Sequence, residues 1–174
     1  MSDRDRLRAA IRDVPDFPEP GVVFKDITPL LQDPELLRLS CQLLAEPYLD
    51  QDVSLVLGVE SRGFIFGPPV ALELGAGFQI ARKPGKLPWN TVSESYELEY
   101  GTDQIEIHSD AIQPGQRVLL LDDVIATGGT AAAAARLADR MGARVVGCAF
   151  LIELEFLGGR KQLSNLDVHS VLAF

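Results

Sequence analysis

Short segments that are apolar throughout alternate with helix-like segments along most of this chain. Residues 54–59, 118–121 and 144–151 contain almost no charged side chain, so they lack the apolar–polar alternation of a strand with one wet face. Strands of this kind are buried on both faces, and they occur in parallel sheets whose crossover helices cover the two faces. The sequence therefore predicts an α/β fold with a central, mostly parallel sheet flanked by helices.

The segments between these strands have apolar side chains at helical spacing, and two further stretches favour strands. Three prolines stiffen residues 15–21 into an extended loop, because each proline fixes its own φ and biases the preceding residue away from helix. The predicted helices cover residues 2–13, 34–48, 64–74 and 131–141, and the additional strands cover residues 78–81 and 168–174.

The 174 residues are enough for one domain with a buried core, which we expect to cover residues 1–174. Within that domain, a polar stretch between residues 86 and 111 interrupts the alternating pattern. A long insertion in a compact α/β domain is more often a lid than a spacer. We therefore predict a flexible lid over residues 90–108.

The chain carries 16 basic and 25 acidic residues, a formal charge of −9. This balance disfavours broad binding to nucleic acid or anionic membranes, so an anionic ligand needs a local cluster of donors. The apolar segments are far shorter than the ~20 residues of a spanning helix, and the charged N-terminus does not resemble a secretory signal. The two cysteines are expected to be reduced and to pack as small apolar residues. We expect a cytoplasmic protein with neither a nucleic acid nor a membrane as partner.

Residues 122–130, DDVIATGGT, lie between the apolar strand at 118–121 and the predicted helix at 131–141. In an open α/β sheet, ligands bind beyond the carboxyl ends of the strands, which is where this segment lies. The glycines let backbone N–H groups turn inward, the helix start contributes its positive dipole end, and Thr127 and Thr130 add hydroxyl donors. This pattern predicts a site for a terminal phosphate group.

Asp122 and Asp123 give the same segment a second function. A phosphate dianion repels carboxylates, so these two residues cannot be its ligands. A short distance along the same ligand they can accept hydrogen bonds from the vicinal hydroxyls of a pentose. A ribose that carries a 5-phosphate satisfies both requirements. The plain alternative, a strand-to-helix turn with capping residues, needs one polar residue and does not explain the whole run.

Five ordered segments make the chain resemble the type I phosphoribosyltransferase family, and within it the members that use adenine. The resemblance spans Pro15 to about Arg160. It implies transfer of the 5-phosphoribosyl group from phosphoribosyl pyrophosphate to N9 of adenine, giving AMP and pyrophosphate, with Mg²⁺ as cofactor and a homodimer as the assembly. The segments are PDFPEPGVVFKDIT at 15–28, ESRGFIFG at 60–67, RKPGKLP at 82–88, SYELEY at 95–100 and LLDDVIATGGT, similar to the family's phosphoribosyl-pyrophosphate motif, at 120–130.

The resemblance implies a role for each residue of the sugar-phosphate site. Asp122 and Asp123 would hold the ribose hydroxyls and act in catalysis. The metal ion would have no direct protein ligand, because the substrate would carry it. The 5-phosphate ligands would be Ala126, Thr127, Gly128, Gly129 and Thr130.

Two further segments are implied to bind the pyrophosphate. Ser61 and Arg62 would form one loop, with Arg62 also acting in catalysis and with a non-proline cis peptide bond near Ser61. Arg82, Lys83 and Lys86 place three cations within five residues of an acidic protein, and Arg82 would reach the site of a neighbouring subunit. Without the resemblance, this second cluster reads as a solvated basic turn.

The base and the lid complete the implied site. Residues 1–33 would form a small hood over the base, in which Phe24 stacks on adenine while the backbones of Val23 and Lys25 read its edge. Leu154 would pack on the other face of the ring. In the lid, Glu99 would handle the proton on N9, and Tyr100 would shield the reacting carbon from water.

Two alternatives remain open. One is a phosphoribosyltransferase of the same fold that uses another base, such as xanthine or orotate. The other is a regulator of transcription that binds phosphoribosyl pyrophosphate without turning it over. The second alternative calls for a DNA-binding appendage or a basic face, and this acidic sequence shows neither.

Overall fold

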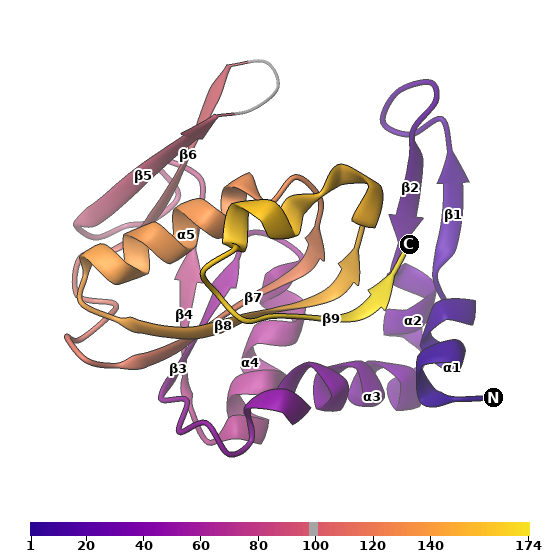
Figure 1. The fold of residues 1–174 in the computed structure, drawn as a ribbon, viewed down its shortest axis with the longest axis horizontal. Helices are drawn as coiled ribbons and strands as arrows, with labels where there is room; N and C mark the ends of the chain where they lie inside the picture. The colour runs from indigo at the N-terminus through magenta and orange to yellow at the C-terminus, as the bar shows by residue number, and fades with distance from the viewer. Residues whose placement is uncertain (98–100) are drawn as a thin grey trace. The chain divides into compact units, whose positions relative to one another are not determined.

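The computed structural model describes residues 1–97 and 101–174, in two compact units, residues 1–43 and 44–174 (Figure 1). The first unit contains a small antiparallel hairpin in which Val14 pairs with Phe24. Its elements are α1 (Asp3–Ala9), β1 (Arg12–Pro15), β2 (Val23–Asp26), α2 (Thr28–Gln32) and most of α3 (Pro34–Ala45).

The predicted first helix is too long at its C-terminal end. α1 ends at Ala9, and the chain is already extended at Arg12. Pro15 biases the residue before it toward extended backbone, and the side chain of Arg12 donates hydrogen bonds of 3.0 and 2.5 Å to Asp26 on the paired strand. The partner strand therefore decides the conformation of these residues. The hood predicted over residues 1–33 stays a prediction.

The second unit contains the predicted sheet. Five strands are hydrogen-bonded in the order β4-β3-β7-β8-β9, and every neighbouring pair is parallel. This confirms the expected fold class. The sheet and its helices are β3 (Leu55–Val59), α4 (Gly63–Leu74), β4 (Gly77–Ala81), β7 (Arg117–Ile125), α5 (Gly129–Arg140), β8 (Arg144–Glu153) and β9 (Val168–Ala173), with three 3-10 turns, η1 (Glu46–Tyr48), η2 (Glu155–Leu157) and η3 (Gly159–Leu163).

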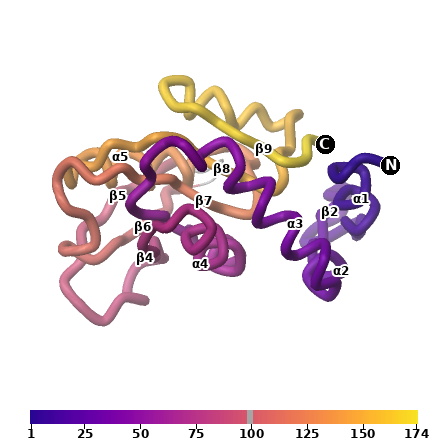
Figure 2. The backbone as a smooth tube through the Cα atoms, turned by 90° about the horizontal axis from the view of Figure 1, so that it is seen from below, coloured from indigo at the N-terminus to yellow at the C-terminus, as the bar shows by residue number. Residues whose placement is uncertain are grey.

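The helices α4 and α5 cover opposite faces of this sheet (Figures 1 and 2). Alternate residues of β3, namely Leu55, Leu57 and Val59, join the core cluster that contains the buried residues of α5. The intervening Val56 is fully buried on the other face, where α4 contributes Phe66. Because both faces are covered, the strands are apolar throughout, as the sequence pattern predicts.

Five consecutive alanines, Ala131–Ala135, form the first half of α5, and all of them are buried. Five successive helical residues point in all directions around the axis, and none of these alanines is more than 8% exposed. The core cluster around it includes strand residues of the sheet together with Tyr96 and Ile105 of a separate hairpin. The start of α5 is therefore held in place by close packing of methyl groups.

That hairpin pairs β5 (Thr91–Glu97) with β6 (Thr102–His108) in antiparallel register. Glu94 of β5 accepts hydrogen bonds from Arg136 (2.9 Å) and Arg140 (2.5 Å), which lie one turn apart on α5. The two strands therefore rest against α5. The lid predicted over residues 90–108 includes this hairpin, and its mobility stays a prediction.

Among the described residues, no helix is both long enough and apolar enough to cross a membrane.

Candidate active site

The loop between β7 and α5 surrounds a cavity of about 90 Å³. All five residues predicted to bind the 5-phosphate, Ala126–Thr130, line it, together with Asp122 and Phe150. Gly128 has a φ of +82°, and a Cβ there would lie 2.3 Å from the backbone oxygen of Gly159. Only glycine fits this position, because both its backbone conformation and its close neighbour exclude a side chain.

The helix α5 begins within this loop. The 12-residue helix begins at Gly129, and no side chain caps it. The first backbone N–H groups of a helix have no partner within the helix, and they carry the positive end of its dipole. Such an N-terminus binds anions, and Thr127 and Thr130 stand beside it on the same cavity.

The two carboxylates lie within β7 and not beyond its end. The predicted strand stops at residue 121, but the structure continues β7 to Ile125, with Asp122 opposite Phe150 and Val124 opposite Ile152 in the neighbouring strand. The hydrogen-bonded ladder thus continues past the aspartates. Two polar residues after an apolar run indicate the end of a strand, but here the ladder to β8 extends through them.

Burial raises the pKa of both carboxylates. For Asp122 the loss of solvent is the largest cause, and the charge of the adjacent Asp123 adds to it. The pKa of Asp123 is also raised by burial, while Arg62 opposes the shift. Arg62 Nε lies 2.7 Å from Asp123 Oδ2. The backbone N–H of Asp123 donates a 2.8 Å hydrogen bond to Asp122 Oδ1.

The loop after β3 lies at the same sheet edge, because β3 and β7 are neighbouring parallel strands. The Glu60–Ser61 peptide bond is cis, as the resemblance implies. Arg62 then begins α4 as its N-cap. The structure thus brings the side chain of Arg62, in the predicted diphosphate loop, to that of Asp123, in the predicted ribose site.

Carboxylates also pair with the basic cluster after β4. Arg82 donates to both oxygens of Glu60, at 3.2 and 3.1 Å, and the backbone N–H of Lys83 donates to the same carboxylate at 2.8 Å. The bond from Arg82 lowers the pKa of Glu60. The side chain of Lys83 forms an ion pair with Asp103 and donates a 2.8 Å hydrogen bond to Tyr96. Lys86 lies near them through its carbonyl oxygen, which accepts a 3.2 Å bond from Arg82.

Sequence reasoning missed Tyr96 and Asp103. Tyr96 belongs to the segment SYELEY, in which the resemblance implies roles only for Glu99 and Tyr100. It is 6% exposed, and its hydroxyl accepts a 3.1 Å hydrogen bond from Thr130 of the phosphate loop. The sequence does contain a signal for Tyr96, because a tyrosine that is buried usually has a hydrogen-bond partner for its hydroxyl. Asp103 shows no local signal, since its partner Lys83 is distant in sequence.

The remaining predicted residues belong to the first unit, to the end of β8 or to the segment outside the described residues. Val23, Phe24 and Lys25 belong to β2 in the first unit, where Phe24 packs edge-on against Phe17 with ring centroids 5.2 Å apart. Leu154 directly follows β8. The predicted lid residues Glu99 and Tyr100 fall outside the part of the chain that the structure describes.

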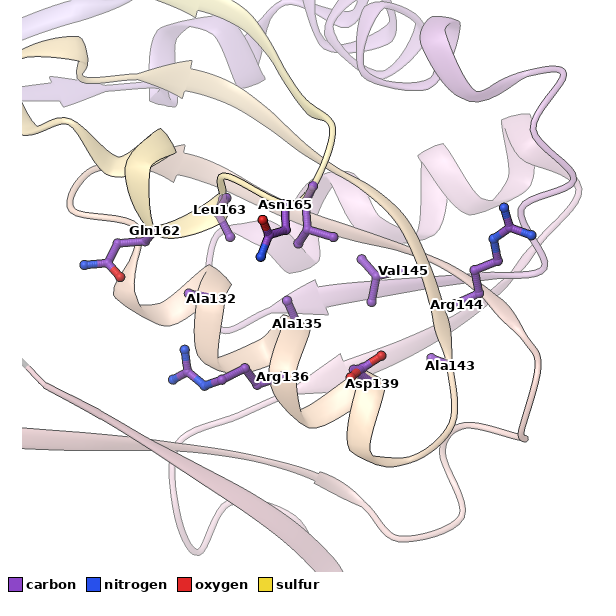
Figure 3. A pocket seen from close by; sticks show the side chains of 11 residues that line it. Ala132, Ala135, Arg136, Asp139, Ala143, Arg144, Val145, Gln162, Leu163 and Asn165 are labelled. Atoms are coloured by element: carbon purple, nitrogen blue, oxygen red, sulfur yellow. The ribbon is translucent and has the colours of Figure 1, made fainter.

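A second cavity, of about 570 Å³, runs along α5 from Ala132 to the C-terminal end of the helix (Figure 3). Arg136 and Asp139 line it from the helix, Val145 from β8, and Leu163 and Asn165 from η3 and the turn after it. Of the residues predicted from the sequence to act in the reaction, none that the structure describes lines this cavity.

A parallel sheet covered on both faces, with an acidic pair and a glycine loop at its carboxyl edge, defines the class of protein. The family model described as "Phosphoribosyl transferase domain" matches residues 27–168, so the chain belongs to the phosphoribosyltransferase family. Its high-identity relatives within that family are adenine phosphoribosyltransferases. One, from Anaeromyxobacter dehalogenans strain 2CP-1, is 58% identical over 98% of this chain and 99% of its own length.

Solved structures agree with this placement. The crystal structure of adenine phosphoribosyltransferase from Rhodothermus marinus is 60% identical and superposes with a TM-score of 0.95, covering 99% of this chain and 98% of that one. The enzyme from Saccharomyces cerevisiae, solved with adenine, is 40% identical with a TM-score of 0.92, covering 97% of this chain and 98% of that one. The resemblance stated from the sequence motifs is thereby confirmed.

Proposed function

We propose that this chain transfers the 5-phosphoribosyl group of phosphoribosyl pyrophosphate to N9 of adenine. The single observation that carries the proposal is 58% identity, over nearly the whole chain, to a relative named for this reaction. In the reaction the bond between ribose C1 and the diphosphate oxygen breaks, a bond between C1 and N9 forms, and the proton on N9 passes to a base. The products are AMP and pyrophosphate.

The sugar is held at its two ends. The loop Ala126–Thr130 binds the 5-phosphate through backbone N–H groups and threonine hydroxyls, and Asp122 and Asp123 accept hydrogen bonds from the ribose hydroxyls. Binding energy from the remote phosphate then orients C1 for attack. The carboxylates also stabilise positive charge that develops on the sugar ring in the transition state.

Five residues are assigned to bind the leaving diphosphate, and the four cations among them offset its negative charge: Ser61, Arg62, Arg82, Lys83 and Lys86. The guanidinium of Arg62 suits bidentate contact with a phosphate, and it already lies beside Asp123. In the proposed homodimer, Arg82 would reach the site of the neighbouring subunit. Its contact with Glu60 lies within one chain.

Glu99 is assigned the proton of N9, and Tyr100 the exclusion of water from C1. Val23, Phe24, Lys25 and Leu154 are assigned to the base. These roles rest on the family resemblance, and the cytoplasmic location expected from the composition likewise stays a prediction.

Mg²⁺ would enter this site as part of the substrate complex. Among the described residues no group of three or more His, Cys, Asp or Glu side chains could hold a metal ion. Asp122 and Asp123 supply the carboxylate oxygens that Mg²⁺ prefers, but Arg62 already pairs with the second of them. These carboxylates would therefore contact the ion through water. Bound to the diphosphate, Mg²⁺ would offset the charge of the leaving group.

The substrate assignment is tested by offering isotope-labelled adenine, guanine and hypoxanthine, each with phosphoribosyl pyrophosphate and Mg²⁺. We expect labelled AMP from adenine and little product from the other two bases. Preferential turnover of another base would replace adenine in the proposal. Tight binding of the sugar diphosphate without turnover of any base would point instead to a regulator.

The base role is tested by Glu99→Gln. We expect turnover to fall by about 10²–10⁴-fold, the contribution of a general base, while the affinity for phosphoribosyl pyrophosphate changes little. The measurements are kcat under saturating substrates and the Kd of the sugar diphosphate. Turnover at the parent rate would remove Glu99 from the proton-transfer step.

A further inference from the structure

The hydroxyl of Tyr96 joins the predicted phosphate loop to the predicted diphosphate cluster. It accepts hydrogen bonds from Thr130 Oγ1 at 3.1 Å and from Lys83 Nζ at 2.8 Å, and it donates to Asp103 Oδ2 at 3.1 Å. A tyrosine hydroxyl has one donor and two acceptor positions, so all three are in use. The tyrosine itself is nearly fully buried, which fixes the hydroxyl in space.

Lys83 is the member of this network that can move. Its backbone N–H is tied to Glu60, so the start of its side chain has a defined place beside the loop that contains Ser61. Its ammonium group stands at the end of a flexible four-carbon stem and remains 42% exposed at the side chain. In the structure that ammonium group forms an ion pair with Asp103, and the hydrogen bond from Lys83 lowers the pKa of Asp103.

Asp103 does not depend on Lys83 for its hydrogen bonds. Its Oδ1 accepts the backbone N–H of Gln104 at 2.7 Å, and its Oδ2 accepts the hydroxyl of Tyr96. If the lysine moves away, both carboxylate oxygens still have a donor. An exchange of the lysine between Asp103 and another anion therefore leaves no buried polar atom without a partner.

We propose that Asp103 is a placeholder carboxylate that occupies Lys83 until the diphosphate displaces it, and that it thereby sets the affinity of the enzyme for diphosphate-containing ligands. The inference rests on the proposed function of Lys83 as a diphosphate ligand. A diphosphate carries more negative charge than one carboxylate, so it wins the exchange, while the competition limits how tightly substrate and pyrophosphate are held. Asp103 acts through Lys83 and is a positioning residue.

The test is Asp103→Asn, which removes the charge and keeps the shape. A half-exposed ion pair is worth little in water, so removing the competitor is expected to tighten binding by about two- to fivefold. We expect this lower Kd for pyrophosphate with Mg²⁺ by calorimetry, and an equally lower KM for phosphoribosyl pyrophosphate. Asp103→Glu keeps the charge and is expected to bind as the parent does. Asp50→Asn, at an exposed position, serves as the matched control for the loss of one negative charge.

A variant that lacks the lysine distinguishes the proposed exchange at Lys83 from direct repulsion between Asp103 and the diphosphate. In Lys83→Met, the additional change Asp103→Asn is expected to leave the Kd of pyrophosphate unaltered. Tightening of similar size in both backgrounds would overturn the proposal, because Asp103 would then act on the ligand directly. Unchanged or weaker binding in Asp103→Asn alone would also overturn it and would give Asp103 a merely structural role. If Asp103→Asn fails to fold, Asp103→Ser takes its place in the same pair of backgrounds.

The two proposals fail separately. Absence of AMP formation by the parent enzyme would reject the proposed function, while the pyrophosphate titrations would still report on the exchange at Lys83. Normal AMP formation with no change in Kd in Asp103→Asn would reject only the placeholder.

Discussion

Two adjacent carboxylates in β7, the central strand of the sheet, destabilise the folded chain. Asp122 is half-buried and lies next to the buried Asp123, so ionising it in the folded chain costs free energy that the unfolded chain does not lose. A site for ribose hydroxyls requires such acceptors at this position. The function proposed for Asp122 and its cost in stability therefore have the same cause.

Asp122→Asn is expected to stabilise the fold at neutral pH. The pKa of Asp122 lies above its ordinary value of 3.8 in the folded chain. The folded state thus binds the proton more tightly, and stability falls as the pH rises from the ordinary pKa through the folded one. The gain in Tm should be largest near pH 7 and vanish below the ordinary pKa, with about 2–4 °C for each kcal/mol.

Thermal scans of parent and variant between acid and neutral pH measure this difference. Asparagine keeps the oxygen that accepts the N–H of Asp123, so the local hydrogen bond is a constant in the comparison. A lower Tm at pH 7 would show that the charged carboxylate stabilises the fold.

At the scale of the element, the loop between β7 and α5 depends on a close approach between two backbones. Gly128 and Gly115 have nearly the same φ, +82° and +83°. A Cβ on Gly115 would meet no atom within 4 Å, whereas one on Gly128 would overlap the backbone of Gly159. The pair therefore separates the conformational requirement for glycine from the requirement for space.

Gly115→Ala is expected to cost about 1–2 kcal/mol, the strain of a left-handed residue with a side chain. Gly128→Ala should cost about 1–3 kcal/mol more, because the backbone of Gly159 must shift. The shift also displaces the phosphate loop, and a displacement of this kind lowers kcat/KM by about 10²-fold. Urea unfolding and steady-state kinetics of both variants measure the two effects. Equal kinetic losses in both would contradict the role assigned to the contact.

The elements that the sequence predicts well are those whose burial leaves a local pattern. The apolar runs that form β3 and β8, and the alanine-rich α5, are found within a few residues of their observed bounds. Where a distant partner decides, prediction failed. The strand at Arg12 depends on Asp26, and the extension of β7 past Asp122 depends on β8.

The same distinction applies to the candidate site. The glycine loop and the acidic pair are contiguous, so their residue types and order could be read as a phosphate and ribose site. The contacts of Lys83 with Tyr96 and Asp103 join a turn after β4 to a hairpin, and they exist only once both are folded.

The prediction that the two cysteines pack as small apolar residues depends only on their burial, and both are buried. Burial raises the pKa of Cys148 to about 12, so its thiol stays protonated at neutral pH.

At the scale of the whole molecule, Arg160 ties the last strand of the sheet to its neighbour. Its guanidinium donates to both oxygens of Glu153 on β8 at 2.7–2.9 Å, and to the carbonyl oxygen of Val168 on β9 at 2.7 Å. The bond from Arg160 lowers the pKa of Glu153, which is 6% exposed. The edge strand β9 is thus held by a side chain as well as by its ladder.

Arg160→Ala is expected to lower the free energy of unfolding by about 1–2 kcal/mol, toward the low end for a charged hydrogen bond because Arg160 is half exposed. The lowered pKa of Glu153 makes this contribution complete above its ordinary pKa of 4.5, and it is lost as the pH falls through the folded pKa. Urea titrations of Arg160→Ala at pH 7 and near pH 4 measure both. Lys161→Ala, in the same 3-10 turn, is the control. A loss that does not shrink at acid pH would contradict the ion pair as its source.

The alanine run of α5 restricts which substitutions a descendant of this chain can accept. Ala133 and Ala134 have no exposed surface, so any carbon added there must push aside neighbouring atoms, whereas Ala132 and Ala135 border the cavity of about 570 Å³. Libraries that randomise the codons of Ala133 and Ala134 should return almost only the parental residue, glycine or serine. Efforts to broaden the enzyme's repertoire are better directed at the hairpin and the first unit, leaving this helix untouched.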